Sequence, residues 1–266
     1  MHEGKFFGSL TAPGNAKMVL TYHEVGPDSS DDFYRVTCAQ LEEHLRVLAE
    51  VRAAARLAST FPQVTFDDGD LSHHQYGFPL LEKYSIPATF FVPAGQIGNR
   101  PNTMTWQHLT DIVSRGHRVQ SHSWSHPFLT RCSPSELQDE LQCSKQTIED
   151  KLGVPVDALS VPYGRWNRRV LRACARTGYK RVYTSDPWRG PKERAGVELW
   201  GRLTVWRTTG ARQLERLVAE QGSSFYILQT WHLMKGALRR LLGDRIYHRL
   251  WWRFARRAGA PGERLA

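Results

Sequence analysis

Several protein classes are excluded by what this chain lacks. No stretch of its 266 residues approaches the roughly 20 consecutive apolar residues that a membrane-spanning helix needs. Its four cysteines are sparse and none belongs to a Cys-x-x-Cys pair, so neither a disulfide scaffold nor a zinc ribbon is predicted. Residues 1–14 hold no apolar run of signal-peptide length, which predicts a cytoplasmic protein, at most peripheral to the inner face of a membrane.

The overall composition is that of an ordinary globular protein. Hydrophobic residues make up 41% and charged residues 23%, which excludes wholesale disorder and a collagen-like fibre. The unusual quantity is charge: 36 lysines and arginines stand against 26 acidic residues, a net charge of +10. Such an excess keeps binding to nucleic acid or to another anionic surface open as a function class.

Most of this charge is concentrated near the C-terminus. Residues 236–257 contain seven arginines and one aspartate, which is +6 of the +10. Apolar residues recur there at every fourth position: Leu238, Leu242, Ile246, Leu250 and Phe254. The spacing predicts a basic amphipathic helix, which either packs on the domain or docks on an anionic membrane face or partner. Because no helix-turn-helix, zinc-finger or RNP-type pattern is present, we expect no nucleic-acid partner.

Short apolar runs alternate with longer amphipathic segments along most of the chain. Strands are predicted over 17–22, 63–66, 88–92, 117–121, 159–161, 180–184 and 225–231. Helices are predicted over 37–55, 78–84, 106–114, 133–152, 168–176 and 213–220. This alternation is typical of an α/β fold with mainly parallel strands. We expect an N-terminal extension (1–16), one domain (17–235) and a basic C-terminal helix and tail (236–266).

Chemically versatile residues cluster where the predicted strands end. Asp67 and Asp68 follow one strand, His122 follows another, Pro162-Tyr163-Gly164 a third and His232 the last. In parallel α/β folds the carboxyl ends of the strands meet at one side, which is where active sites are built. The distribution therefore favours an enzyme.

Two carboxylates and two imidazoles form the most informative of these groups. A bare Asp-Asp-Gly is usually a solvated acidic turn, and a lone pair of histidines is usually a surface feature. His122 and His126 are spaced four apart, which would place both on one side of a helical turn. One carboxylate with two imidazoles leaves a divalent metal with open positions, as in a catalytic site. The same donors also suit a non-haem iron oxygenase, although the carboxylate there usually follows the first histidine by two residues.

Together these motifs resemble those of polysaccharide deacetylases with a NodB homology domain, carbohydrate esterase family four. Residues 65–70 (T-F-D-D-G-D) are similar to the first motif of the family and residues 122–126 (H-S-W-S-H) to its second. Residues 161–165 (V-P-Y-G-R) resemble the third motif. The flanking segments 79–92 and 20–25 also look like family segments, and the likeness extends over about 17–232.

This resemblance implies a fold and a reaction. The fold would be a distorted (β/α) barrel of about seven parallel strands. The reaction would be metal-dependent removal of N-acetyl groups from amino sugars in a polysaccharide, an oligosaccharide or a glycan precursor. Asp68, His122 and His126 would hold the metal, with Zn²⁺ as the default ion for histidine ligands.

The resemblance also implies roles for three further residues. Asp67 would act as the general base on water, and the backbone N–H of Tyr163 would donate to the oxyanion. His232 would protonate the departing sugar amine. Acid and base would then be separate groups, as their opposite starting protonation states require.

Three departures from the family pattern leave alternatives open. Ser160 stands where the family has an arginine bonded to the catalytic aspartate, so what orients Asp67 is undetermined. In a partial fourth motif, Asp186 and Trp188 either tune His232 and line the sugar groove or simply pack a loop. Thr230 stands where the family has a leucine. A degenerate domain that binds carbohydrate or an anionic surface without catalysis is therefore the alternative function.

Three other histidines are assigned no catalytic role. We expect His73 and His74, just after the first motif, to face solvent. His23 is expected to be structural.

Overall fold

A computed structural model describes residues 18–27, 32–54, 61–188 and 190–218, together with residues 230 and 234. The expected N-terminal extension, most of the strand predicted over 225–231, His232 and the basic segment 236–266 lie outside the described residues. Within the described part of the chain, no helix is long and apolar enough to cross a membrane.

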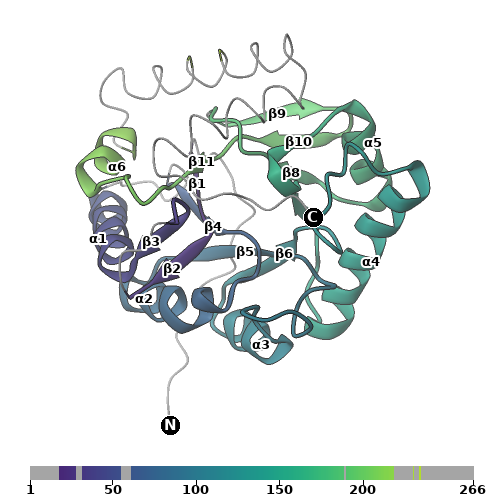
Figure 1. Ribbon diagram of the computed structural model, residues 1–266. Helices are drawn as coiled ribbons and strands as arrows, with labels where there is room; N and C mark the ends of the chain where they lie inside the picture. The colour runs from purple at the N-terminus through teal and green to yellow at the C-terminus, as the bar shows by residue number, and fades with distance from the viewer. Residues whose placement is uncertain are drawn as a thin grey trace.

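One sheet of nine strands forms the centre of the described structure (Figure 1). Its order is β11 (Leu203–Thr204), β1 (Val19–Tyr22), β4 (Gln63–Phe66), β5 (Ala88–Val92), β6 (Arg118–Ser121), β7 (Ala158–Ser160), β8 (Arg181–Tyr183), β10 (Val197–Trp200) and β9 (Pro191–Arg194). Neighbouring strands are parallel except at the β9–β10 pair. The predicted α/β class with mainly parallel strands is confirmed, and the carboxyl ends of the parallel strands share one side.

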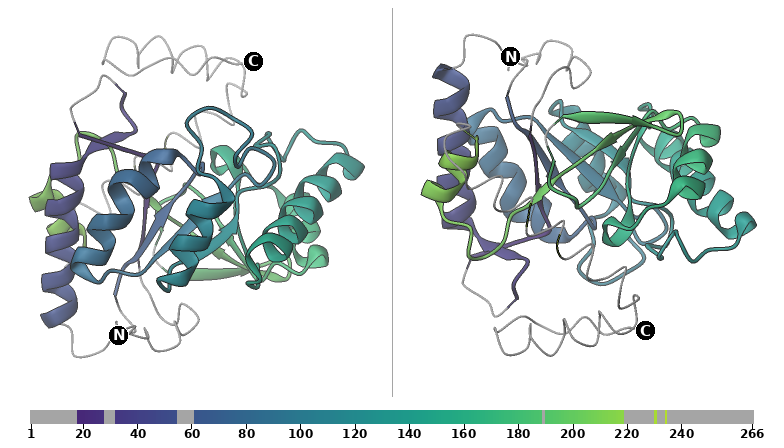
Figure 2. Two further views of the ribbon diagram at one scale, coloured as in Figure 1. Left: turned by 90° about the horizontal axis from the view of Figure 1, so that it is seen from below. Right: turned by 90° about the horizontal axis from the view of Figure 1, so that it is seen from above.

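The helices lie outside this sheet. They are α1 (Cys38–Ala54), α2 (Phe78–Tyr84), α3 (Trp106–Ser114), α4 (Pro134–Leu152), α5 (Arg168–Thr177) and α6 (Ala211–Val218). Figure 2 shows α1 beside α6 at one end of the sheet and α4 beside α5 at the other, and both pairs are in contact. Two short parallel strands, β2 (Glu24–Gly26) and β3 (Arg35–Thr37), form a separate small sheet.

Side-chain contacts show how strongly the main sheet curves. The Tyr183 hydroxyl on β8 donates a hydrogen bond of 3.0 Å to Gln63 on β4, although three strands separate β8 from β4 in the sheet order. Phe91 on β5 packs against Tyr183 with ring centroids 5.0 Å apart. The inner face therefore closes on itself as in the expected distorted barrel, while strand pairing among the described residues runs as an open series from β11 to β9.

Capping residues define both ends of α4. The Ser133 hydroxyl accepts from the Glu136 N–H at the start of α4 and the Glu136 carboxylate accepts from the Ser133 N–H, forming a capping box. Gly153 ends the same helix with φ +65°, a conformation that glycine adopts without steric cost.

The hairpin β9–β10 was not predicted from the sequence. Every residue of β9 is exposed, so the strand carries no alternation of buried and exposed positions to identify it. The turn between the strands is made by Ala195 and Gly196, with φ values of +52° and +87°. The hairpin leads the chain back into the molecule at Gly201.

Candidate active site

Asp67 and Asp68 point in different directions although they are adjacent. Asp67 continues the inner face of β4 and is 2% exposed, whereas the Asp68 side chain is 44% exposed. Asp68 has φ +73°, in the left-handed region that residues other than glycine seldom adopt. This turn at the strand end directs one carboxylate into the interior and the other to the rim.

His122 and His126 converge through a left-handed turn. The sequence spacing predicted a helical turn, which is wrong: residues 122–126 are not helical, and Ser123 and His126 have φ values of +66° and +65°. The Ser121 hydroxyl accepts from the Ser123 N–H at 3.1 Å, and the Ser123 hydroxyl accepts from the His126 N–H at 3.1 Å. The serines of this segment thus stabilise a strained backbone that brings the imidazoles together.

Helix α4 holds the middle of the same turn. One carboxylate oxygen of Glu140 accepts from the backbone N–H groups of Trp124 and Ser125, both at 2.9 Å. The other oxygen accepts from the Ser125 hydroxyl at 2.5 Å. Because α4 is well capped and packed on the sheet, these bonds fix the turn to a rigid element.

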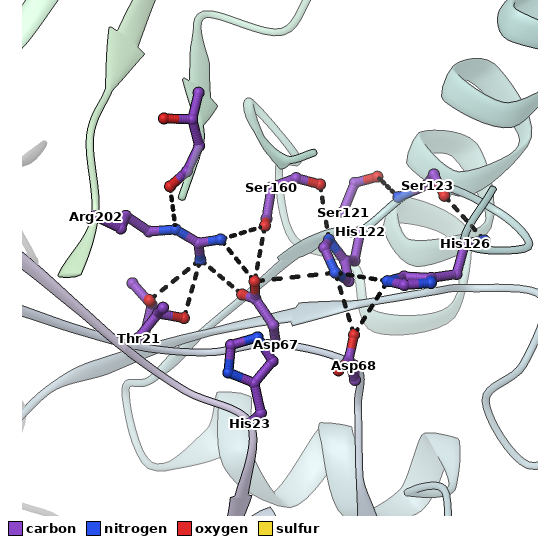
Figure 3. Close-up of polar contacts among 12 residues, drawn as sticks. Thr21, His23, Asp67, Asp68, Ser121, His122, Ser123, His126, Ser160 and Arg202 are labelled. Atoms are coloured by element: carbon purple, nitrogen blue, oxygen red, sulfur yellow. Dashed lines mark hydrogen bonds and ion pairs between the residues drawn. The ribbon is translucent and has the colours of Figure 1, made fainter. Parts of the chain in front are cut away.

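Three donor atoms meet at the rim in a nearly equilateral triangle (Figure 3). The Nε2 atoms of His122 and His126 are 3.2 Å apart, and each is 3.2 Å from Asp68 Oδ1. Ligand atoms of a tetrahedral zinc site, at about 2.0–2.1 Å from the ion, lie about 3.3 Å from one another. The spacing and the chemistry of these donors therefore fit a divalent metal.

One hydrogen bond fixes which ring nitrogen of His122 faces the triangle. His122 Nδ1 donates to the Ser160 carbonyl oxygen at 2.7 Å, which leaves the lone pair of Nε2 facing the triangle. The His122 side chain is 3% exposed and that of His126 is 20% exposed, so the triangle is buried on one side and open on the side of Asp68. Asp68 is thus the member of the triangle that faces solvent most.

Asp67 lies behind the triangle as an ionised, tightly bound carboxylate. Its Oδ2 is 3.9 Å from His122 Nε2 and accepts from the Ser160 hydroxyl at 3.0 Å. Arg202 donates to both carboxylate oxygens, at 2.7 Å and 2.6 Å. Burial alone would raise the pKa of Asp67, but the charges of Arg202 and His122 and the bonds from Arg202 bring it down to about 2.

Sequence reasoning did not find Arg202. The residue follows β10, in the hairpin region that was not predicted, and no family motif marks it. One signal was present: Trp200 and Arg202 are two residues apart, so they share a face if the strand direction continues. Trp200 packs in the interior cluster with Val19 and Tyr183, which makes Arg202 an inward-facing charge.

Tyr163 lies next to the triangle. It has φ +59°, and its ring stacks on Phe128 with centroids 4.0 Å apart and lies 4.7 Å from the His126 ring. Among the described residues, its side chain is one of the few large hydrophobic ones that are exposed. The structure thus brings Tyr163 to the rim beside His126, and its role as an oxyanion donor stays a prediction.

Asp186 and Trp188 are placed beside the backbone of Arg202. The Asp186 carboxylate accepts from the Trp166 indole N–H at 3.0 Å, and the Asp186 carbonyl oxygen accepts from the Arg202 N–H at 3.0 Å. Lys192 lies over the Trp188 ring at 4.4 Å. These contacts are those of loop packing, and a link from Asp186 to His232 stays a prediction because His232 is outside the described residues.

The two histidines after the first motif differ in their surroundings. His73 is fully buried, and its Nε2 donates to the His23 carbonyl oxygen at 2.5 Å, so the expectation that it faces solvent is wrong. The π-helical turn over His73–Gly77 rotates it beneath β4, where its ring packs against Phe66. His74 is partly exposed and bonds to Asp111 at 3.0 Å.

His23 lies beside Asp67 (Figure 3). Its Nδ1 is buried and has no hydrogen-bond partner among the described residues. Burial lowers the pKa of His23, and the charges of Asp68 and Asp67 partly oppose this effect. An imidazole so close to the candidate base is a second candidate for proton transfer.

Comparisons with known proteins agree with this geometry. A family model described as polysaccharide deacetylase matches residues 62–182. The chitooligosaccharide deacetylase of Bradyrhizobium sp. (strain ANU 289) is 32% identical over 136 residues, which are 48% of this chain and 58% of the relative. That of Sinorhizobium fredii (strain NBRC 101917 / NGR234) is 30% identical over 156 residues, which are 55% of this chain and 69% of the relative. The chain thus spans little more than half the length of the first of these relatives.

A solved structure shows the same fold. The Streptococcus pyogenes deacetylase PplD, in complex with acetate, superposes with a TM-score of 0.68 at 22% identity, covering 75% of this chain and 97% of that one. The chain belongs to the polysaccharide deacetylase family.

Proposed function

We propose that this protein is a metal-dependent hydrolase that removes N-acetyl groups from amino sugars in a polysaccharide, an oligosaccharide or a glycan precursor. Its family is metal-dependent, and the two relatives described above are named chitooligosaccharide deacetylases. One observation carries the proposal: an ionised carboxylate, Asp67, lies 3.9 Å from a histidine of an open Asp-His-His triangle. A base beside a metal site with free positions is what amide hydrolysis by water requires.

Zinc is the metal that we propose for this site. Two imidazoles and one carboxylate suit Zn²⁺, with cobalt or nickel able to replace it in vitro. Asp68, His122 and His126 would hold it. When bound there, the metal polarises the acetyl carbonyl and makes water more acidic.

The chain's own groups then divide the proton transfers. Asp67 accepts a proton from the water that attacks the carbonyl carbon, which requires it to start ionised, and its low pKa meets that requirement. The Tyr163 backbone N–H donates to the oxygen that becomes negative. His232 donates a proton to the sugar nitrogen as the C–N bond breaks. The products are acetate and a free amino sugar.

The alternative of a degenerate, non-catalytic domain rested on Ser160, which lacks the charge of the family arginine. Arg202 supplies that charge to Asp67 from the segment between β10 and β11. This contact supports an active enzyme over a binding protein.

Acetate release tests the proposal directly. The zinc-loaded protein is incubated with chitooligosaccharides of increasing length and with small N-acetylated sugars, and acetate is quantified with time. We expect stoichiometric acetate and free amine from at least one of them, and no release by Asp67→Asn. Binding of these sugars without turnover, at full metal occupancy, would favour the non-catalytic alternative.

The identity of the acid is tested with the same assay. We expect His232→Gln to lower kcat at least 100-fold on N-acetylated sugars while metal content is unchanged. His23→Gln is the comparison, because His23 lies beside Asp67. A large loss in His23→Gln with an active His232→Gln would assign proton donation to His23 instead.

A further inference from the structure

Asp67 is held in a geometry that no motif of the sequence accounts for. Position 160, where the family resemblance implied an arginine, holds a buried serine. Its hydroxyl gives Asp67 one neutral hydrogen bond of 3.0 Å. A single neutral bond neither compensates the charge of a buried carboxylate nor fixes the plane of its two oxygens.

Arg202 supplies both the charge and the plane. Its Nη1 and Nη2 atoms donate side by side to Asp67 Oδ1 and Oδ2, at 2.7 Å and 2.6 Å. Such a two-pronged pair fixes orientation as well as charge, because the guanidinium and the carboxylate are both planar. The Arg202 side chain is 1% exposed, so water does not screen the pair.

The guanidinium is itself held by several strands. Nε donates to the Thr184 carbonyl oxygen at 3.0 Å, and Nη1 also contacts the hydroxyls of Thr21 and Thr65 at 3.2 Å and 3.4 Å. Nη2 donates to the Ser160 hydroxyl at 2.8 Å. These partners lie on β1, β4 and β7 and just after β8, so Arg202 occupies a fixed position inside the curved sheet (Figure 3).

Small residues at two positions make this arrangement possible. Ser160 is short enough to leave space for the guanidinium, and its hydroxyl bridges Arg202 and Asp67. A Cβ on Gly201 would lie 2.5 Å from the Asp186 carbonyl oxygen and 2.7 Å from the Trp188 N, so only glycine permits this path of the chain. Ser160 and Gly201 together thus allow Arg202 to reach Asp67.

We propose that Arg202, in the segment between β10 and β11, is the positioning residue for the general base and fills the role that the family resemblance implied for an arginine at position 160. This inference rests on the proposed function. Ser160 also connects the base to the metal site, because its carbonyl oxygen accepts from His122 Nδ1 while its hydroxyl contacts Asp67. Arg202 therefore aligns Asp67 relative to the metal ligands without touching substrate itself.

Kinetics of Arg202→Met and Arg202→Lys at equal zinc content test this role. We expect Arg202→Met to lower kcat at least 100-fold with KM within threefold of wild type, and Arg202→Lys to retain an intermediate rate. The double variant Ser160→Arg/Arg202→Met moves the arginine to position 160, where the family resemblance implied it. We expect it to be at least tenfold faster than Arg202→Met, a recovery that loss of stability does not explain.

Arg181→Met is the matched control. Arg181 is also buried and paired with an aspartate, Asp157, but lies outside the site. We expect it to lose stability and keep kcat. If Arg202→Met does not fold, Arg202→Lys and its Ser160→Arg double variant carry the comparison.

The outcomes separate this inference from the proposed function. An active wild type with Arg202→Met within threefold of its kcat, or with an equal loss in Arg181→Met, overturns the role of Arg202 alone. A zinc-loaded wild type that releases no acetate from any N-acetylated sugar contradicts the proposed function and, with it, the role of Arg202.

Discussion

We expect two neighbouring side chains at the site, Asp67 and Asp68, to have separable roles as base and metal ligand. We expect Asp67→Asn to keep the metal and lose at least 100-fold in kcat, since the amide cannot accept the proton and Asp67 is not part of the ligand triangle. His122→Ala removes one of the three ligand atoms, so both metal and activity should be lost. Metal content per chain is measured by mass spectrometry beside acetate release.

His74 and Asp111 provide a control of matched chemistry. They form an imidazole–carboxylate pair of 3.0 Å on the surface, outside the site. Asp111→Asn and His74→Ala should change neither metal content nor kcat. Full turnover by Asp67→Asn, or metal retained at wild-type affinity by His122→Ala, would contradict the assignment.

The sequence predicted the site only as far as local signals reach. Asp67, Asp68, His122 and His126 could be identified because each follows an apolar strand and has a characteristic spacing. The left-handed turns that orient these side chains could not be predicted from the sequence, because aspartate, serine and histidine rarely adopt positive φ. Arg202 could not be found because its pairing with Asp67 spans 135 residues and depends on sheet curvature.

At the scale of elements, capped and amphipathic segments were the predictable ones. Helix α4 begins at Pro134 and ends at Leu152, matching the signals of Ser133 and Gly153. The hairpin β9–β10 was missed because the exposed β9 has no apolar pattern. Short strands beside a long-range partner are defined by pairing, and a sequence alone does not contain that information.

Helix α1 carries a buried histidine that should make stability depend on pH. His44 on α1 is fully buried; its Nε2 donates to the Thr209 carbonyl oxygen at 2.9 Å and its Nδ1 accepts from the Tyr22 hydroxyl at 3.2 Å. Burial lowers the pKa of His44 below its ordinary value, against the opposing effect of the Thr209 bond. The folded protein therefore holds His44 neutral.

The sign of the effect follows from proton uptake. Below about pH 6.5 the unfolded chain protonates His44 before the folded one does, so stability is lost as pH falls from there toward the folded pKa. One such group changes the free energy of unfolding by up to ~1.4 kcal/mol per pH unit. We expect His44→Gln to show a shallower decline between pH 6.5 and 5 in urea unfolding. Equal slopes for both proteins would contradict the prediction.

At the scale of the whole molecule, most of the net charge lies in a different part of the sequence from the candidate active-site residues. Residues 236–257 hold +6 of the net +10, so the remainder of the chain is only +4. We expect the full chain to co-sediment with vesicles containing anionic lipid, and deletion of residues 236–266 to abolish this without changing kcat on a small N-acetylated sugar. Binding should weaken with salt and disappear on neutral vesicles. Unchanged sedimentation after the deletion would contradict a membrane role.

Metal binding should stabilise the whole fold, since the ligands come from loops after β4 and β6, with β5 between those strands. A metal bound only by the folded chain at 100 times its Kd adds about 2.7 kcal/mol. For a domain of this size that raises Tm by about 5–10 °C. Chelation should lower Tm by this amount and zinc should restore it, while His122→Ala should respond to neither. If chelation removed the metal from the wild type without lowering Tm, the prediction that one metal ion links the three residues and stabilises the fold would be wrong.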